Sequence, residues 1–239
     1  MTTNYLADIE DLGATEEKDT LGGKKFTVES GVYDAVIDAA YFTESTSSKA
    51  KAINIVLHIP VEGKDEPMEV RDQIWYMNGQ GSIRSKDGKG YGYNFIKADT
   101  LALLTTNKPL KDQNVKNTFV ELWDPEAKKR LPQEKASLTD MIGKSVKVAV
   151  KEIRTNKTSY NKATKEETKL PDERVFNEVD KYFYKDGRTS TEIRSNAPTT
   201  FIEEWKKKWE GKLDDKFDAT VQATDGTSGA PAGATPSLF

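Results

Sequence analysis

Three stretches of alternating apolar and polar residues constrain the fold of this chain more than any other feature. In the first, residues 31–42, apolar side chains occupy every second position from Tyr33 to Tyr41. The other two stretches span residues 52–59 and 67–78. Because side chains on a β-strand alternate between its two faces, each stretch predicts a half-buried strand. Short polar turns separate the stretches, so we expect an antiparallel meander.

The chain downstream of the meander predicts a helix and then two further strands. Ile96, Leu101 and Leu104 suit one face of a short helix that ends near residue 107. Residues 110–136 have no clear periodicity, although they contain a small apolar cluster of Phe119, Val120, Leu122 and Trp123. Two more strands are predicted, over residues 144–154 and 174–185, with a polar loop over residues 155–172 between them.

A terminal helix completes the expected order of elements. Thr200 and Glu203 have the spacing of a capping box, and the helix after it would carry one apolar stripe of Ile202, Trp205, Trp209 and Leu213. Five strands with a helix between the third and fourth is the order of the oligonucleotide/oligosaccharide-binding (OB) fold. We therefore expect a mainly β chain with a few helices: an OB-fold-like five-stranded antiparallel barrel with a helical excursion and a C-terminal helix. Other small barrels and mixed α+β sheets stay open.

Both ends of the chain differ from its middle in composition. Hydrophobic residues make up only 36% of the 239 residues, and the polar surplus gathers at the ends. Segments of this kind bury too little apolar surface to offset the entropy of ordering them. We expect a disordered arm over residues 1–24, one domain over 25–213 that includes a helix at 200–213, and a disordered acidic tail over 214–239.

The charge of the chain follows the same division. The net charge is −3, but residues 1–30 carry −4 and residues 214–239 carry −3, which leaves +4 on the middle. One interpretation is ordinary solvated surface. The other is a polyanion-binding core with a competing acidic tail.

Composition excludes several common kinds of chemistry. The chain has no Cys and one His, His58, so thiolate chemistry is excluded and a histidine-based zinc site is improbable. The glycines between Asn78 and Asn94 do not have phosphate-loop spacing, since six residues separate Gly81 from Gly88. No run approaches a membrane span of about 18 apolar residues, and no secretory signal is visible. We expect a protein that is not an enzyme, needs no cofactor or metal, and does not bind a membrane.

The residues do favour a surface for single-stranded nucleic acid, which needs cations for the phosphates and flat side chains for the bases. On the third predicted strand, Arg71, Gln73 and Trp75 face away from Val70 and Ile74. Packing of Trp75 under the terminal helix is the alternative. The other candidates lie in the glycine-rich loop, on the fourth predicted strand and in the loop after it: Arg84, Lys86, Lys89, Tyr91, Tyr93, Lys147, Lys151, Lys157, Tyr160, Lys162 and Lys165.

The chain resembles the single-stranded DNA-binding proteins of tailed phages. The resemblance covers residues 25–185 and is carried by three segments, GVYDAVIDAAYFTES, EVRDQIWYMNGQGS and SLTDMIGKSVKVAVKE. Members of this group often end in a disordered acidic tail with a terminal Phe, and this chain ends in Leu238 and Phe239. Its tail differs in having only four scattered acids, Asp214, Asp215, Asp218 and Asp225.

The resemblance implies sequence-independent binding and protection of single-stranded DNA in phage replication and recombination, in the host cytoplasm. It also implies that Leu238 and Phe239 recruit replication or recombination proteins. Whether the protein forms a homodimer is left open by the sequence. The alternatives from other classes are a structural or assembly module without nucleic-acid binding, and a metal-dependent DNA-processing enzyme.

Overall fold

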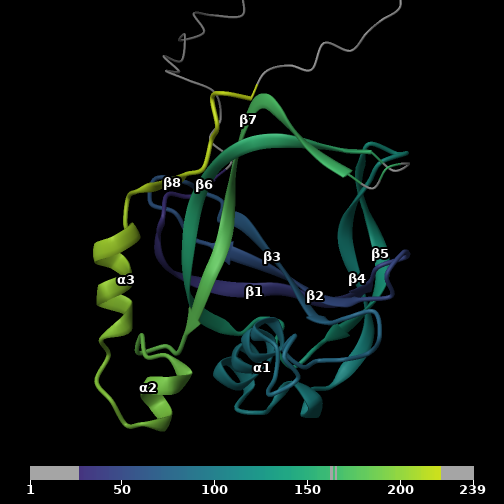
Figure 1. Cartoon of the computed structure of the whole chain (residues 1–239). Helices are drawn as coiled ribbons and strands as arrows, with labels where there is room; N and C mark the ends of the chain where they lie inside the picture. The colour runs from purple at the N-terminus through teal and green to yellow at the C-terminus, as the bar shows by residue number, and fades with distance from the viewer. Residues whose placement is uncertain (1–26, 162–163, 165, 222–239) are drawn as a thin grey trace, which may run out of the picture.

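A computed structural model describes residues 27–161, 164 and 166–221 of the chain (Figure 1). Its first three strands are β1 (Gly31–Glu44), β2 (Lys51–Ile59) and β3 (Met68–Met77). They pair antiparallel in sequence order, β1 with β2 and β2 with β3. The predicted meander is therefore confirmed.

The region after β3 holds one predicted element and one unexpected one. Helix α1 (Tyr93–Thr106) buries Leu101 and Leu104, as its periodicity indicates, but leaves Ile96 exposed. A single 3-10 turn, η1 (Leu110–Asp112), follows. The stretch without clear periodicity then forms an antiparallel hairpin of β4 (Val115–Asp124) and β5 (Lys129–Leu138).

The next two strands are much longer than the sequence predicts. β6 (Ser145–Asn161) and β7 (Glu166–Phe183) pair antiparallel from Lys147 opposite Phe183 to Asn161 opposite Glu166. The prediction of a polar loop over residues 155–172 is therefore wrong, because strands occupy most of it. Beyond Asn156 the ribbon is mostly exposed on both faces, so it lacks the apolar alternation that identifies a half-buried strand.

The C-terminal elements are α2 (Ser190–Arg194), α3 (Phe201–Trp209) and β8 (Leu213–Asp215). The predicted capping box at Thr200 is wrong, since its side chain does not cap α3. The capping box is formed at α2 instead, by Thr189 and Glu192. The helix also ends at Trp209 rather than at residue 213, and the chain then adds β8 to β6 as a parallel strand.

The described residues are mainly β, in one largely antiparallel sheet of eight strands rather than five. β1 is the shared strand: it pairs with β2 along its C-terminal half and with β6 over residues 31–36. No strand pairing joins β3 to β7 in the described part of the chain, so the sheet is open there. In Figure 1, β1, β2 and β3 cross the middle of the molecule, α1 lies below them, and the β6–β7 ribbon arches above.

A bulge in β1 gives the sheet two apolar faces. The register with β2 shifts between Ile37 and Ala39, so Ala39 and Tyr41 lie on the face opposite Ile37. The sequence prediction of a single face from Tyr33 to Tyr41 is therefore wrong. The main core lies between the sheet and α1, and a second small cluster joins Ala39 and Tyr41 to Val120 of β4.

A buried polar cluster connects β3, α1 and β7 where the sheet is open. The Asp72 carboxylate accepts a hydrogen bond from the Tyr182 hydroxyl at 2.8 Å and pairs with the Lys97 ammonium at 2.8 Å. Lys97 also donates to the Val179 carbonyl at 2.7 Å. Burial, with the nearby Asp72 carboxylate, raises the pKa of the Tyr182 hydroxyl well above its ordinary value. The cluster holds the two strands together without a backbone ladder.

Candidate functional site

The outer face of β2 and β3 carries the central candidate residues. Val70 and Ile74 are buried while Arg71, Gln73 and Trp75 are exposed, as the alternation predicts. We call Asn54, Arg71, Gln73 and Trp75 the Trp75 face. Trp75 is 40% exposed and does not pack under the terminal helix, which contacts Ala149 and Phe183 instead.

A chain of side-chain hydrogen bonds fixes the Trp75 indole on this face. The Trp75 Nε1–H donates to Gln73 Oε1 at 3.1 Å, and Gln73 Nε2 donates to Asn54 Oδ1 at 3.0 Å. Asn54 Nδ2 in turn donates to Thr43 Oγ1 on β1 at 2.8 Å. The polar edge of the indole is therefore held to the sheet, and an aromatic surface stays accessible for stacking.

The turn between β1 and β2 packs against the start of the glycine-rich loop beside Trp75. A Cβ at position 79 would collide with the Ser48 carbonyl oxygen, so only glycine permits this approach. A shallow hollow follows, lined by Trp75, Met77 and Asn78 on one side and by Ser45, Ser48 and Ala50 on the other. A flat ligand group stacked on Trp75 would therefore also contact the turn between β1 and β2.

The glycine-rich loop is ordered by its own contacts. Arg84 and Tyr91 form an isolated antiparallel bridge, and the Ser85 hydroxyl donates to the Asp87 carboxylate. The Asn94 side chain donates to the Trp75 carbonyl at 3.3 Å, which ties the far end of the loop to β3. The predicted candidates in the loop and at the start of α1 are all exposed: Arg84, Lys86, Lys89, Tyr91 and Tyr93.

A groove lies between the Trp75 face and the β4–β5 hairpin. Its volume is about 380 Å³, and it is lined by residues that include His58, Arg71, Phe119 and Arg130. Glu69 accepts hydrogen bonds here from Arg71 at 2.6 Å and from both terminal nitrogens of Arg130, at 2.7 and 3.0 Å. Burial alone would raise the pKa of Glu69, but the hydrogen bonds from the two guanidinium groups lower it to about 2.

The β4 strand supplies two exposed aromatic residues that the sequence analysis did not propose as site residues. Phe119 is 75% exposed and Trp123 is 58% exposed, while Val120 and Leu122 between them pack against the second cluster. This alternation is visible in the sequence. It is short, however, and its partner strand contains Pro132, which weakens the strand pattern.

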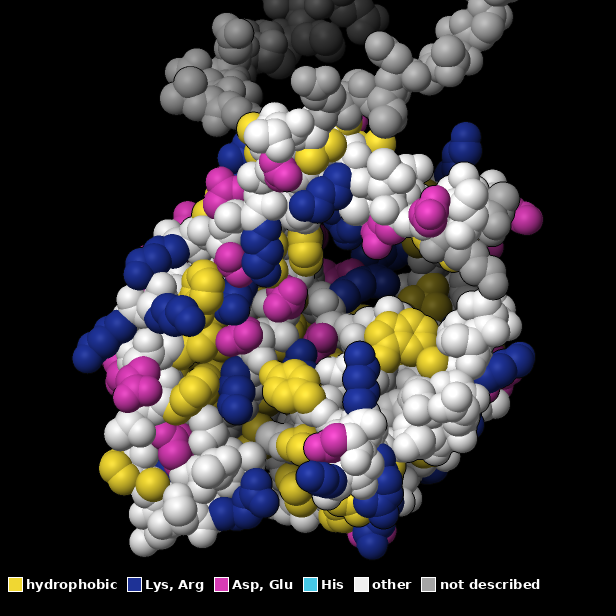
Figure 2. Space-filling model, viewed as in Figure 1, with side chains coloured by type: hydrophobic (Ala, Val, Ile, Leu, Met, Phe, Trp, Pro, Cys, Tyr) yellow, Lys and Arg dark blue, Asp and Glu magenta, His cyan; other side chains and the backbone are white. Residues whose placement is uncertain are grey.

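The β6–β7 ribbon presents Lys157 and Tyr160 as exposed side chains on a strand, not on a loop. Figure 2 shows a hollow between this ribbon and the β4–β5 hairpin, with basic, acidic and hydrophobic side chains around its rim. Lys162 and Lys165 lie outside the described residues, as do Leu238 and Phe239.

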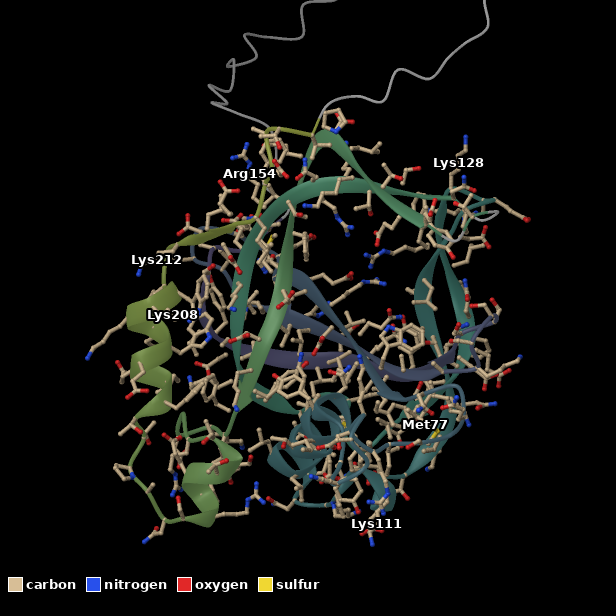
Figure 3. All side chains as sticks on the ribbon, in the orientation of Figure 1. Met77, Lys111, Lys128, Arg154, Lys208 and Lys212 are labelled. Atoms are coloured by element: carbon tan, nitrogen blue, oxygen red, sulfur yellow. The ribbon has the colours of Figure 1, made fainter. Side chains whose placement is uncertain are left out.

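Lys147 and Lys151 are not brought to the Trp75 face. Lys147 pairs with Asp34 of β1 at 2.6 Å. Lys151 pairs with Asp180 at 3.4 Å, and its ammonium lies 4.1 Å from the centre of the Trp209 ring of α3. Figure 3 places Lys208 and Lys212, beside Trp209, on the opposite side of the molecule from Met77 at the end of β3.

No protein-family model matches the chain, and a search of curated proteins finds no relative. Within the described residues, no three His, Asp or Glu side chains are grouped so that they could hold a metal ion. None of the helices described is both long and apolar enough to cross a membrane.

Proposed function

We propose that the protein binds single-stranded DNA without sequence preference. The observation that carries the proposal is Trp75: an exposed indole, tied by hydrogen bonds to an ordered sheet, with Arg71 on the same face. Stacking on an aromatic ring tolerates every base, and cations beside it interact with the phosphates.

Other exposed aromatic residues on neighbouring elements would extend the surface. Phe119 of β4 lines the groove that Arg71 also lines, and Trp123 of β4 and Tyr91 of the glycine-rich loop are exposed as well. An extended surface of this kind suits several successive nucleotides of a flexible strand. A rigid duplex keeps its bases stacked inside the double helix, so few of them could stack on these side chains.

We also propose that the sheet is a variant OB barrel. The path β3-β2-β1-β6-β7 brings β3 and β7 next to each other, with α1 packed against both strands. The Asp72–Tyr182 hydrogen bond would then stand at the closure. In this interpretation the β4–β5 hairpin is an insertion after the helix, and the Trp75 face is the ligand face usual for the fold.

The role in phage replication and recombination, with Leu238 and Phe239 recruiting partner proteins, rests on the sequence resemblance. Residues 214–221 belong to the folded domain instead: Asp215 pairs with Arg154 at 3.2 Å, and the Asp218 backbone exchanges two hydrogen bonds with Asn156. A deletion that tests the tail should therefore begin at residue 222, not at 214. It removes only one of the four acids, Asp225, so it should leave the melting temperature unchanged and change DNA affinity little; a marked loss of affinity would contradict a competing acidic tail.

The proposal is tested by titrating the protein with oligo(dT) while following tryptophan fluorescence. We expect quenching and an affinity that falls steeply as salt rises. Trp75→Phe should reduce the quench, whereas Trp209→Phe, a matched control at the C-terminal end of α3, should retain it. A lack of binding even at about 50 mM salt would refute the proposal, because phosphate contacts are strongest at low salt.

A further inference from the structure

Two arginines from different parts of the chain converge on one carboxylate in the groove. Arg71 comes from β3 and Arg130 from β5, and both donate to Glu69. Arg130 uses both terminal nitrogens, one to each carboxylate oxygen, at 2.7 and 3.0 Å. The two guanidinium groups and the Glu69 carboxylate together carry one net positive charge, and the carboxylates of Asp38 and Glu121 line the same groove.

This geometry suits a phosphodiester as well as it suits a carboxylate. A phosphodiester carries one negative charge and two free oxygens, which match the two parallel N–H donors of a guanidinium fork. Arg71 lies four residues before Trp75 on the same face of β3, about 13 Å along the strand. A strand of DNA stacked on Trp75 could therefore bring a backbone phosphate to the two arginines.

We propose that Arg71 and Arg130 form a phosphate-binding subsite, and that Glu69 occupies this subsite until a DNA phosphate displaces it. The inference rests on the proposed single-stranded DNA binding. It adds that a carboxylate of the protein itself, Glu69, competes with DNA for the two arginines. Glu69 is thus a regulator of affinity as well as a tie between the sheet and the β4–β5 hairpin.

The exposure of the two arginine side chains makes the exchange feasible. The Arg71 and Arg130 side chains are 43% and 51% exposed and the Glu69 side chain is 25% exposed, so a phosphate can approach the guanidinium groups from solvent.

Glu69→Gln tests the inference, because it removes the competing charge and retains the shape of the side chain. We expect oligo(dT) to bind about fivefold more tightly than to the wild type. The two arginines would then hold salt anions that DNA binding displaces, so the affinity should fall more steeply with salt than it does in the wild type. Glu204→Gln, on the exposed side of α3, is the matched control for net charge and should change affinity less than about twofold.

A second pair of variants keeps the test decisive if Glu69→Gln fails to fold. Arg130→Gln should weaken binding several-fold more than Lys207→Gln, which removes one exposed cation from α3. If no form of the protein binds oligo(dT), the proposed function fails together with this inference. If the wild type binds, but Glu69→Gln is no tighter than Glu204→Gln or Arg130→Gln no weaker than Lys207→Gln, the subsite is refuted and the proposed function stands.

Discussion

Two regions of the molecule combine tryptophan with basic residues on a strand, and only one of them is an open surface. On β3, Trp75 and Arg71 are exposed on the outer face. On β6, Lys151 lies under α3, where Trp209 covers its ammonium and the Trp205 indole donates to Asp180 at 2.6 Å. The same residue types thus form a candidate binding face in one place and a helix–sheet contact in the other.

The difference arises from what covers each strand. Glu192 of α2 accepts hydrogen bonds from the backbone N–H groups of Thr200 and Phe201, each at 2.9 Å, and so fixes where α3 begins. The helix then places Ile202 and Trp205 against Ala149 and Phe183. No helix of the described chain packs in this way on the Trp75 face, so its indole stays accessible.

Replacing Trp205 should give the largest effect and should act on stability alone. Trp205 is only 4% exposed, so Trp205→Ala leaves a cavity and removes one of the two partners of Asp180. We expect the free energy of unfolding to fall by about 3–5 kcal/mol, measured by urea denaturation. The DNA affinity of the folded protein should stay unchanged; a large loss of affinity would show that the two regions are not independent.

Trp75→Ala should show the opposite pattern. We expect binding to oligo(dT) to weaken by about 1–3 kcal/mol, because one stacking surface is lost. The free energy of unfolding should change by less than about 1 kcal/mol, since the side chain is 40% exposed. Unfolding free energy and oligo(dT) affinity should be measured on the same preparation. A Trp75→Ala variant that is destabilised but binds normally would mean that Trp75 stabilises the fold and does not contact DNA.

Glu192 should make the covered region sensitive to acid. Burial favours the protonated form of Glu192, but hydrogen bonds from the Phe201, Thr189 and Thr200 backbone lower its pKa to about 2. A lowered pKa stabilises the fold above the ordinary pKa of 4.5, and this contribution is lost as the pH falls from about 4.5 to about 2. Glu192→Gln should unfold about 1–2 kcal/mol more easily at pH 7.

The pH series supplies the control for that variant. The difference in unfolding free energy between wild type and Glu192→Gln should shrink below pH 4.5 and approach zero only below about pH 2, where most wild-type carboxyls also carry a proton. A constant difference across this range would mean that the ionised carboxylate does not stabilise the start of α3. DNA affinity at pH 7 should be equal in the two proteins.

The parts of the fold that sequence predicts well are those with strong local periodicity. β3 and α1 each bury one face, as β1 does up to its bulge, and the alternation or helical repeat records that burial directly. The exposure of Trp75 followed from the same alternation, because Val70 and Ile74 mark the opposite face.

The parts that sequence does not predict depend on contacts between distant segments. The bulge after Ile37 sends Tyr41 to a second face, and only the β4–β5 hairpin packed there explains its burial. The outer part of the β6–β7 ribbon is polar on both sides, so its strands leave no periodic signal. Glu69 meets Arg130 across 61 residues of sequence, and no local pattern reveals that pair.

The two lysines under and beside α3 provide the smallest expected effect and the sharpest test of the comparison. Sequence alone makes Lys147 and Lys151 look like DNA contacts, but Lys147 pairs with Asp34, and Lys151 lies between Asp180 and the Trp209 ring. Lys147→Ala and Lys151→Ala should each change oligo(dT) affinity by less than about twofold, the effect expected of one distant screened charge. Lys151→Ala should also lower the melting temperature, because it removes the cation beneath Trp209 and leaves Asp180 with one partner fewer. If either variant instead loses affinity as strongly as Trp75→Ala, DNA must also contact the α3 side of the molecule. The helix would then not exclude DNA from the strand that it covers.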